Sequence, residues 1–170
     1  MDELARAAGL SRTAFYFYFP GKNQVLMAAA SEIAEEYHAE ADRWWSGEGP
    51  PEQLVREALE GVVEAYVRHQ AVLRTSIEVA TYDPEFATFY NGLLERFVTA
   101  TAEQLRRDRS AGRLRALDPL TVAQALVWMV ERTNHQLIGI QGRPPEEVVE
   151  AIIQVWVHAL YPDSVVSAGT

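Results

Sequence analysis

The sequence predicts an all-α fold on three observations. Long segments such as Asn23–Trp45 consist of helix-forming residues with neither glycine nor proline. Proline recurs where a first helical turn would start, usually beside an acidic residue. Apart from one aromatic run near the amino terminus, no segment has the alternation of a half-buried strand.

The first expected element is a short helix over residues 2–10, "DELARAAGL", whose apolar residues share one face. Gly9 fits a carboxy-terminal cap, because glycine readily adopts a left-handed conformation. Ser11 fits the amino-terminal cap of a second helix. Two helices joined by a tight turn are therefore expected.

The second element contains five consecutive aromatic residues, Phe15–Phe19, which fit a strand or a helix. A lone strand would leave its backbone groups without a partner, so a helix is favoured. Pro20-Gly21 ends it. Phe15 and Phe19 then point inward, and the residues that face outward include Arg12, Thr13 and Tyr16.

The remaining elements are long helices separated by breaking residues. The helix over Asn23–Trp45 ends at Ser46–Pro51, "SGEGPP", which is the clearest break in the chain. We expect two domains, residues 1–45 and 46–170. The later helices are expected at 52–69, 71–81, 84–109, 119–141 and 145–161.

The bulk composition narrows the class of protein. The 170 residues include no cysteine and carry a net charge of −9, so broad coating of nucleic acid is disfavoured. Without cysteine there are no disulfides, which favours a cytoplasmic location. No apolar run approaches the roughly 20 residues of a membrane span, so no membrane partner is expected.

The pattern helix–Gly-x-Ser–helix is typical of a helix-turn-helix, whose second helix enters the major groove of DNA. Arg12 can reach guanine or phosphate, and Thr13 can touch a thymine methyl group. Hydroxyl and ammonium groups further along can bind phosphates. The expected DNA-binding residues are Ser11, Arg12, Thr13, Tyr16, Tyr18 and Lys22.

Over this segment the sequence resembles the TetR family of transcriptional regulators. Residues 4–22, "LARAAGLSRTAFYFYFPGK", follow the family pattern A-x-x-A-G-[VL]-S-x-x-x-[LF]-Y-x-Y-F-x-x-K. The "FYFYFP" form, with "ERT" at Glu131–Thr133 and "VWVHALY" at Val155–Tyr161, is most similar to the EthR-like subgroup. Beyond residue 45 the resemblance rests mainly on helix order.

The resemblance implies a three-helix DNA-binding domain followed by a helical domain for effector binding and dimerisation. It implies a homodimeric repressor that leaves a palindromic double-stranded operator when a small hydrophobic effector binds. By the same resemblance, we expect the chain to lack the family's first helix, and Thr13 stands where the family often has glycine. The alternative is a helical dimer that binds a ligand or partner but not DNA, because that helix is missing.

The expected effector-binding residues are mostly aromatic or aliphatic. Those on the helix at 84–109 form one stripe, which fits an ordinary core or a cavity wall. The others fall where the resemblance places the pocket lining. The full set is Val62, Tyr66, Phe86, Phe89, Tyr90, Leu93, Phe97, Met129, Val130, Thr133 and Trp156.

The resemblance also concerns polar anchors for the effector. Val127 and Val130 stand where subgroup members can carry amide side chains. Asn134 and Gln136 are near in sequence and are expected on a different face. The anchor would then have moved or been lost, which implies a more apolar effector.

The helices at 119–141 and 145–161 are apolar nearly all round, so both of their sides must be covered. One side faces the domain core. The other either faces a partner subunit, in a two-fold four-helix interface, or is covered within a monomer. We expect the homodimer.

No enzymatic or metal site is expected. Glu35-x-x-His38 supplies half of a di-iron carboxylate pattern, which needs a second Glu-x-x-His pair that the sequence lacks. His38 is expected on a helix surface. We find no phosphate-binding glycine loop or nucleophile elbow, so no cofactor is expected.

Overall fold

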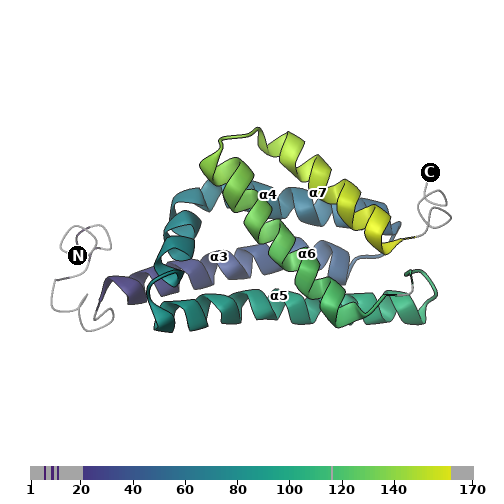
Figure 1. Ribbon diagram of the computed structural model, residues 1–170, viewed down its shortest axis with the longest axis horizontal. Helices are drawn as coiled ribbons and strands as arrows, with labels where there is room; N and C mark the ends of the chain where they lie inside the picture. The colour runs from purple at the N-terminus through teal and green to yellow at the C-terminus, as the bar shows by residue number, and fades with distance from the viewer. Residues whose placement is uncertain (1–5, 7–8, 10, 12–20, 116, 162–170) are drawn as a thin grey trace.

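The structure is a computed structural model that describes residues 6, 9, 11, 21–115 and 117–161, and these ranges contain helices and no strand. The all-α prediction is confirmed for this part of the chain. In Figure 1, α3 and α5 run side by side along the length of the molecule, α6 crosses them and α7 lies on the opposite side from α5. The elements are α3 (Lys22–Trp45), α4 (Pro51–Ala80), α5 (Pro84–Ser110), α6 (Pro119–Thr133), η1 (Asn134–Ile140) and α7 (Pro145–Leu160).

Four of these helices, α4, α5, α6 and α7, begin with proline, as the sequence predicts. Proline suits this position because the first helical N–H groups have no partner within the helix. Two of the starts have a side-chain cap. Asp83 accepts a hydrogen bond from the Phe86 backbone N–H at 2.9 Å, and Asp118 accepts one from Thr121 at 2.9 Å.

The two helices expected at 52–69 and 71–81 form one kinked element. His69 has φ −110° and ψ 16°, outside the helical range, so the expected break is a bend within α4. Glu36 on α3 contacts His69 Nε2 at 2.7 Å and also pairs with Arg68. The bend in α4 is thus tied directly to α3.

The prediction of a single α-helix over 119–141 is wrong for its last third. α6 ends at Thr133, and Asn134–Ile140 form the π-helix η1. A π-helix has i→i+5 hydrogen bonds and a wider turn, so it changes which side chains face inward. Gly142, at φ 66°, ends the element.

A buried polar network joins three helices at the carboxy-terminal end of α3. Asp108 on α5 is only 1% exposed. Its Oδ2 accepts a hydrogen bond from the Tyr161 hydroxyl at 2.7 Å, and its Oδ1 accepts one from Arg113 at 2.7 Å. Trp44 Nε1 in turn donates to the Tyr161 hydroxyl oxygen at 3.1 Å. These bonds tie α3 to α5 and to the end of α7.

A second, smaller apolar cluster lies at the opposite end of α3. Its buried members are Ile77, Val79, Phe86 and Tyr90, which come from α4 and α5. Leu26 and Met27 at the start of α3 pack against it, so we call it the α3-start cluster. Asn23 on α3 also donates a hydrogen bond to Asp83, the cap of α5.

Candidate functional site

A cavity of about 120 Å³ lies between the helices. A dry apolar cavity of about 150 Å³ can bind benzene, so this one is slightly smaller than a cavity known to hold a single-ring molecule. Helices α3, α4, α5, α6 and α7 all contribute side chains to its wall, as does the first residue of η1. The wall is almost wholly aliphatic and aromatic, which suits an apolar ligand.

Seven of the eleven predicted effector-binding residues line this cavity: Val62, Tyr66, Tyr90, Leu93, Phe97, Val130 and Trp156. The other four do not. Phe86 and Phe89 belong to the α3-start cluster, with ring centres 5.7 Å apart. Met129 packs against the main core, and Thr133 is half-buried near the end of α6.

One wall of the cavity was missed entirely in the sequence. It is a stripe on α3: Ala30, Ile33, Ala34, Tyr37, Ala41, Trp44 and Trp45. The signal was present, because most of these residues recur at intervals of three and four, as on one face of a helix. Trp44 packs edge-on against Trp156, with ring centres 5.1 Å apart. The helix that follows the segment predicted to bind DNA therefore also forms part of the cavity wall.

The cavity has one polar end, built around Glu131 and Asn134. Asn134 is 2% exposed, and its Oδ1 has no hydrogen-bond partner. It lines the cavity with Val127 and Val130, which corrects its expected placement on another face. The three residues are spaced i, i+3, i+7, so they share one helical face.

Three tyrosine hydroxyl groups surround this polar end. Tyr90 donates to Glu131 Oε1 at 3.3 Å, whereas the buried hydroxyls of Tyr37 and Tyr66 have no partner. Burial raises the pKa of Tyr66 to about 12, with Arg74 opposing the shift and Glu131 adding to it. Burial also raises the pKa of Glu131, opposed by Arg132 and the Tyr90 hydrogen bond.

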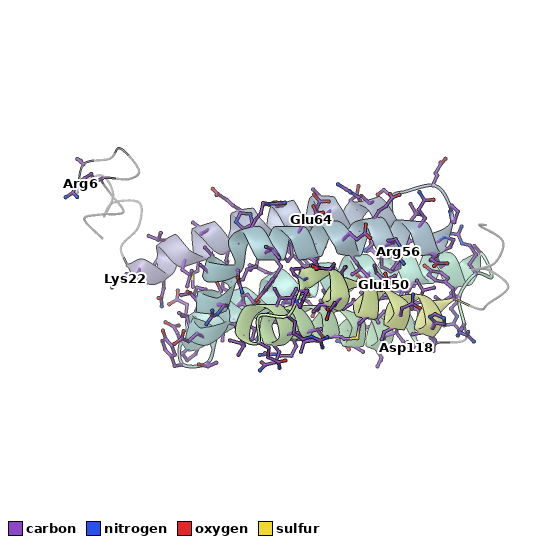
Figure 2. The ribbon with its side chains drawn as sticks, turned by 90° about the horizontal axis from the view of Figure 1, so that it is seen from above. Arg6, Lys22, Arg56, Glu64, Asp118 and Glu150 are labelled. Atoms are coloured by element: carbon purple, nitrogen blue, oxygen red, sulfur yellow. The ribbon has the colours of Figure 1, made fainter. Side chains whose placement is uncertain are left out.

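Most of the predicted DNA-binding residues lie outside the described residues: Arg12, Thr13, Tyr16 and Tyr18. Ser11 and Lys22 are described and exposed. Figure 2 places Lys22 at the outer end of α3, at the opposite end of the molecule from Asp118. The same view shows Arg56 on α4 beside Glu150 on α7, an ion pair of 2.7 Å.

The Glu35-x-x-His38 pair does not form part of a metal site among the described residues. Glu35 pairs with Arg96 at 2.8 Å. His38 was expected on the surface, and this is wrong: it is half-buried between the rings of Trp45 and Phe97, with ring centres 4.8 Å away in both cases. Within the described ranges no three His, Cys, Asp or Glu side chains gather as a metal site. None of the described helices has the length and apolar character needed to cross a bilayer.

Fold and cavity together define the class: a helical bundle with an apolar cavity between its helices, which follows an amino-terminal helix-turn-helix sequence along the chain. Residues 55–162 match the family described as "Transcriptional regulator EthR, C-terminal domain". Residues 1–29 match "Bacterial regulatory proteins, tetR family". The chain belongs to the TetR family of transcriptional regulators, with a carboxy-terminal domain of the EthR type. Members of this family are regulators and not enzymes.

Curated relatives agree with this assignment. The HTH-type transcriptional regulator EthR of Mycolicibacterium smegmatis is 31% identical over 165 residues, covering 95% of this chain and 76% of the relative. EthR of Mycobacterium tuberculosis is 29% identical over 171 residues, covering 96% of this chain and 78% of the relative.

Solved structures share the fold. A regulatory protein TetR from Rhodobacter sphaeroides has a TM-score of 0.74 at 21% identity, covering 94% of this chain and 86% of its own. The TetR-family regulator PfmR from Thermus thermophilus has a TM-score of 0.71 at 20% identity, covering 95% and 88%.

Proposed function

We propose that this protein is a ligand-responsive transcriptional repressor of the cytoplasm. Residues 1–45 bind a palindromic operator, and residues 46–170 bind a small hydrophobic effector and form a homodimer. Binding of the effector releases the protein from DNA. The observation that carries the proposal is the double role of α3, which follows the DNA-binding segment directly and lines the cavity with seven side chains.

The proposed switch works by population shift. The recognition helices of a dimer must lie about 34–36 Å apart, one DNA turn, or a multiple of it. A ligand that favours another position of α3 changes this spacing and weakens DNA binding. Tyr90 supports the route, because it lines the cavity and also belongs to the α3-start cluster. The coupling is bounded by the ligand's difference in affinity for the two states, commonly about 1–3 kcal/mol.

We expect a saturating cavity ligand to weaken operator binding by about 5- to 150-fold, which corresponds to that coupling. The operator can be selected by the protein from a random pool of double-stranded DNA. Binding of 2-phenylethanol, a neutral single-ring probe, is followed by the fluorescence of Trp44 and Trp156 in the wall. DNA affinity is then measured by fluorescence anisotropy with and without the probe. Equal affinity at full occupancy of the cavity would contradict the switch.

Arg12→Ala, measured in the same assay, tests whether Arg12 contacts the operator. We expect it to lose at least about 5-fold in affinity for the selected operator, because a guanine contact contributes about 1–3 kcal/mol. Its affinity for 2-phenylethanol should not change. Unchanged operator affinity would remove Arg12 from the readout. Equal loss on unrelated DNA would assign it to phosphate binding.

The proposed dimer face is an exposed apolar surface on the last helices. Its large members are Leu120 and Trp128 on α6, Ile140 at the end of η1 and Val155 on α7. Exposed large apolar side chains, where they form one patch, are typical of a protein interface. A two-fold axis through this surface would pair α6 and α7 with their copies, in the four-helix interface expected from the sequence.

Val155→Arg is expected to weaken the dimer by more than about 100-fold, since the substitution occurs twice in a two-fold interface and each copy places a charge in the proposed apolar contact. Sedimentation velocity at micromolar concentration measures the change. Val67→Arg on α4 is the matched control, because Val67 is 44% exposed and Val155 49%. A dimer that survives Val155→Arg but not Val67→Arg would move the interface to α4.

A further inference from the structure

The polar end of the cavity, at Glu131 and Asn134, carries hydrogen-bond acceptors that a purely hydrophobic effector could not bind. Glu131 is the one charged residue among the described residues that line the cavity. Its side chain is 9% exposed, and the buried Oε2 has no hydrogen bond. The nearest cation, Arg132 Nε, lies 3.7 Å from Oε2, beyond hydrogen-bond distance, and most of the Arg132 side chain faces solvent.

Asn134 supplies a second acceptor at the same end. It follows Glu131 by three residues along the helix, and its buried Oδ1 is also unpaired. Buried acceptors without partners are uncommon in proteins, because each loses its bonds to water on burial. Two of them in the wall of one cavity can accept hydrogen bonds from a ligand that carries donors.

The negative charge of Glu131 distinguishes between the classes of ligand that could donate these hydrogen bonds. An acid such as a fatty acid would bring a second carboxylate beside Glu131, and like charges at short range repel. A neutral alcohol offers one O–H donor for two acceptors, and it leaves the partly solvated Arg132 as the counter-charge paired with the carboxylate. A protonated amine offers up to three N–H donors and the opposite charge.

The aromatic wall favours the same class. Tyr37, Tyr66 and Tyr90 line the cavity near Glu131, and Tyr66 and Tyr90 lie within its electrostatic reach. Aromatic faces attract cations through the ring quadrupole, most strongly where water is excluded. No lysine, arginine or histidine is among the described lining residues, and Arg132, which pairs with Glu131 at 3.7 Å, is not part of the cavity wall.

We propose that the cavity selects a protonated amine, with an apolar body of single-ring size and an N–H head bound between Glu131 and Asn134. The inference rests on the proposed function and specifies its effector by chemical class. Glu131 supplies the counter-charge, Asn134 Oδ1 accepts a second N–H, and the aromatic rings cover the apolar body.

Three single-ring probes of similar size test the proposal by isothermal titration calorimetry: 2-phenylethylamine, 2-phenylethanol and phenylacetate. We expect the amine to bind at least about 10-fold more tightly than the alcohol, since a charge-assisted hydrogen bond and cation–π attraction add to the shared apolar term. The acid should bind most weakly. Equal affinities for amine and alcohol, stronger binding of the acid, or no binding of any probe would overturn the proposal.

Glu131→Gln assigns the preference to the carboxylate, because glutamine keeps the shape and an acceptor for Tyr90. We expect it to remove at least about 10-fold of the amine affinity and to leave the alcohol nearly unchanged. The matched control is Glu64→Gln on α4, an exposed position that is labelled in Figure 2 and does not line the cavity. An unchanged amine-to-alcohol ratio in Glu131→Gln would overturn the assignment.

Asn134→Leu is a second variant, which tests the amine preference if Glu131→Gln fails to fold. It should lower affinity for the amine more than for the alcohol. Measuring release of operator DNA by each probe distinguishes failure of the amine preference from failure of the proposed switch. If amine and alcohol bind equally and both release operator DNA, the switch holds and amine selectivity fails. If the amine binds most tightly but DNA stays bound, selectivity holds and the switch fails.

Discussion

Asp108→Ala is expected to lower the free energy of unfolding by about 3 kcal/mol, because removing one partner of a buried polar network leaves the others unpaired. The Tyr161 hydroxyl would lose its acceptor at 2.7 Å, and Arg113 would lose its carboxylate partner at 2.7 Å. Urea denaturation, followed by circular dichroism at one fixed protein concentration, measures the loss.

Glu103→Ala is the matched control for this substitution. Glu103 lies on the same helix, one turn before the network, and is exposed. Its replacement should change the free energy of unfolding by no more than about 0.5 kcal/mol. A loss below about 1 kcal/mol for Asp108→Ala would mean that water replaces the network at little cost.

Phe86→Ala is expected to lower the free energy of unfolding by about 3–5 kcal/mol, the usual cost of removing a buried aromatic ring. Phe86 is fully buried in the α3-start cluster, against Phe89 at 5.7 Å between ring centres. Because it does not line the cavity, its removal should not directly change probe binding in protein that remains folded.

The control for Phe86→Ala is Tyr82→Ala, in the turn between α4 and α5. Tyr82 is an exposed aromatic residue, so its removal should have little effect on unfolding. A small loss for Phe86→Ala would show that neighbouring side chains collapse into the space. Loss of probe binding in the folded variant would show that the cluster and the cavity form one packing unit.

The proline-led helix starts were the most predictable part of this fold from sequence. Proline at the first position fixes a helix start locally, and Asp83 and Asp118 cap the backbone that follows them. His69 was harder. The bend there leaves α4 continuous and is accompanied by contacts with Glu36 on another helix, which local sequence does not reveal.

The cavity was predicted in part. Residues on α5 such as Tyr90, Leu93 and Phe97 follow a stripe visible in the sequence, but the same stripe includes Phe86 and Phe89, which pack elsewhere. A helix of 27 residues is longer than the cavity, so one stripe serves two clusters. The α3 wall and Asn134 were detectable by the same spacing rule.

The buried network around Tyr161 has a mechanical consequence. It fixes the carboxy-terminal end of α3, and the 24 residues of this helix extend about 36 Å. If α3 rotates about that fixed end by only about 5°, its other end moves by about 3 Å, because the displacement grows with distance along the helix. A ligand that shifts the middle of α3 would thus move its first residue, Lys22, farther than the middle itself, next to the segment that we propose binds DNA.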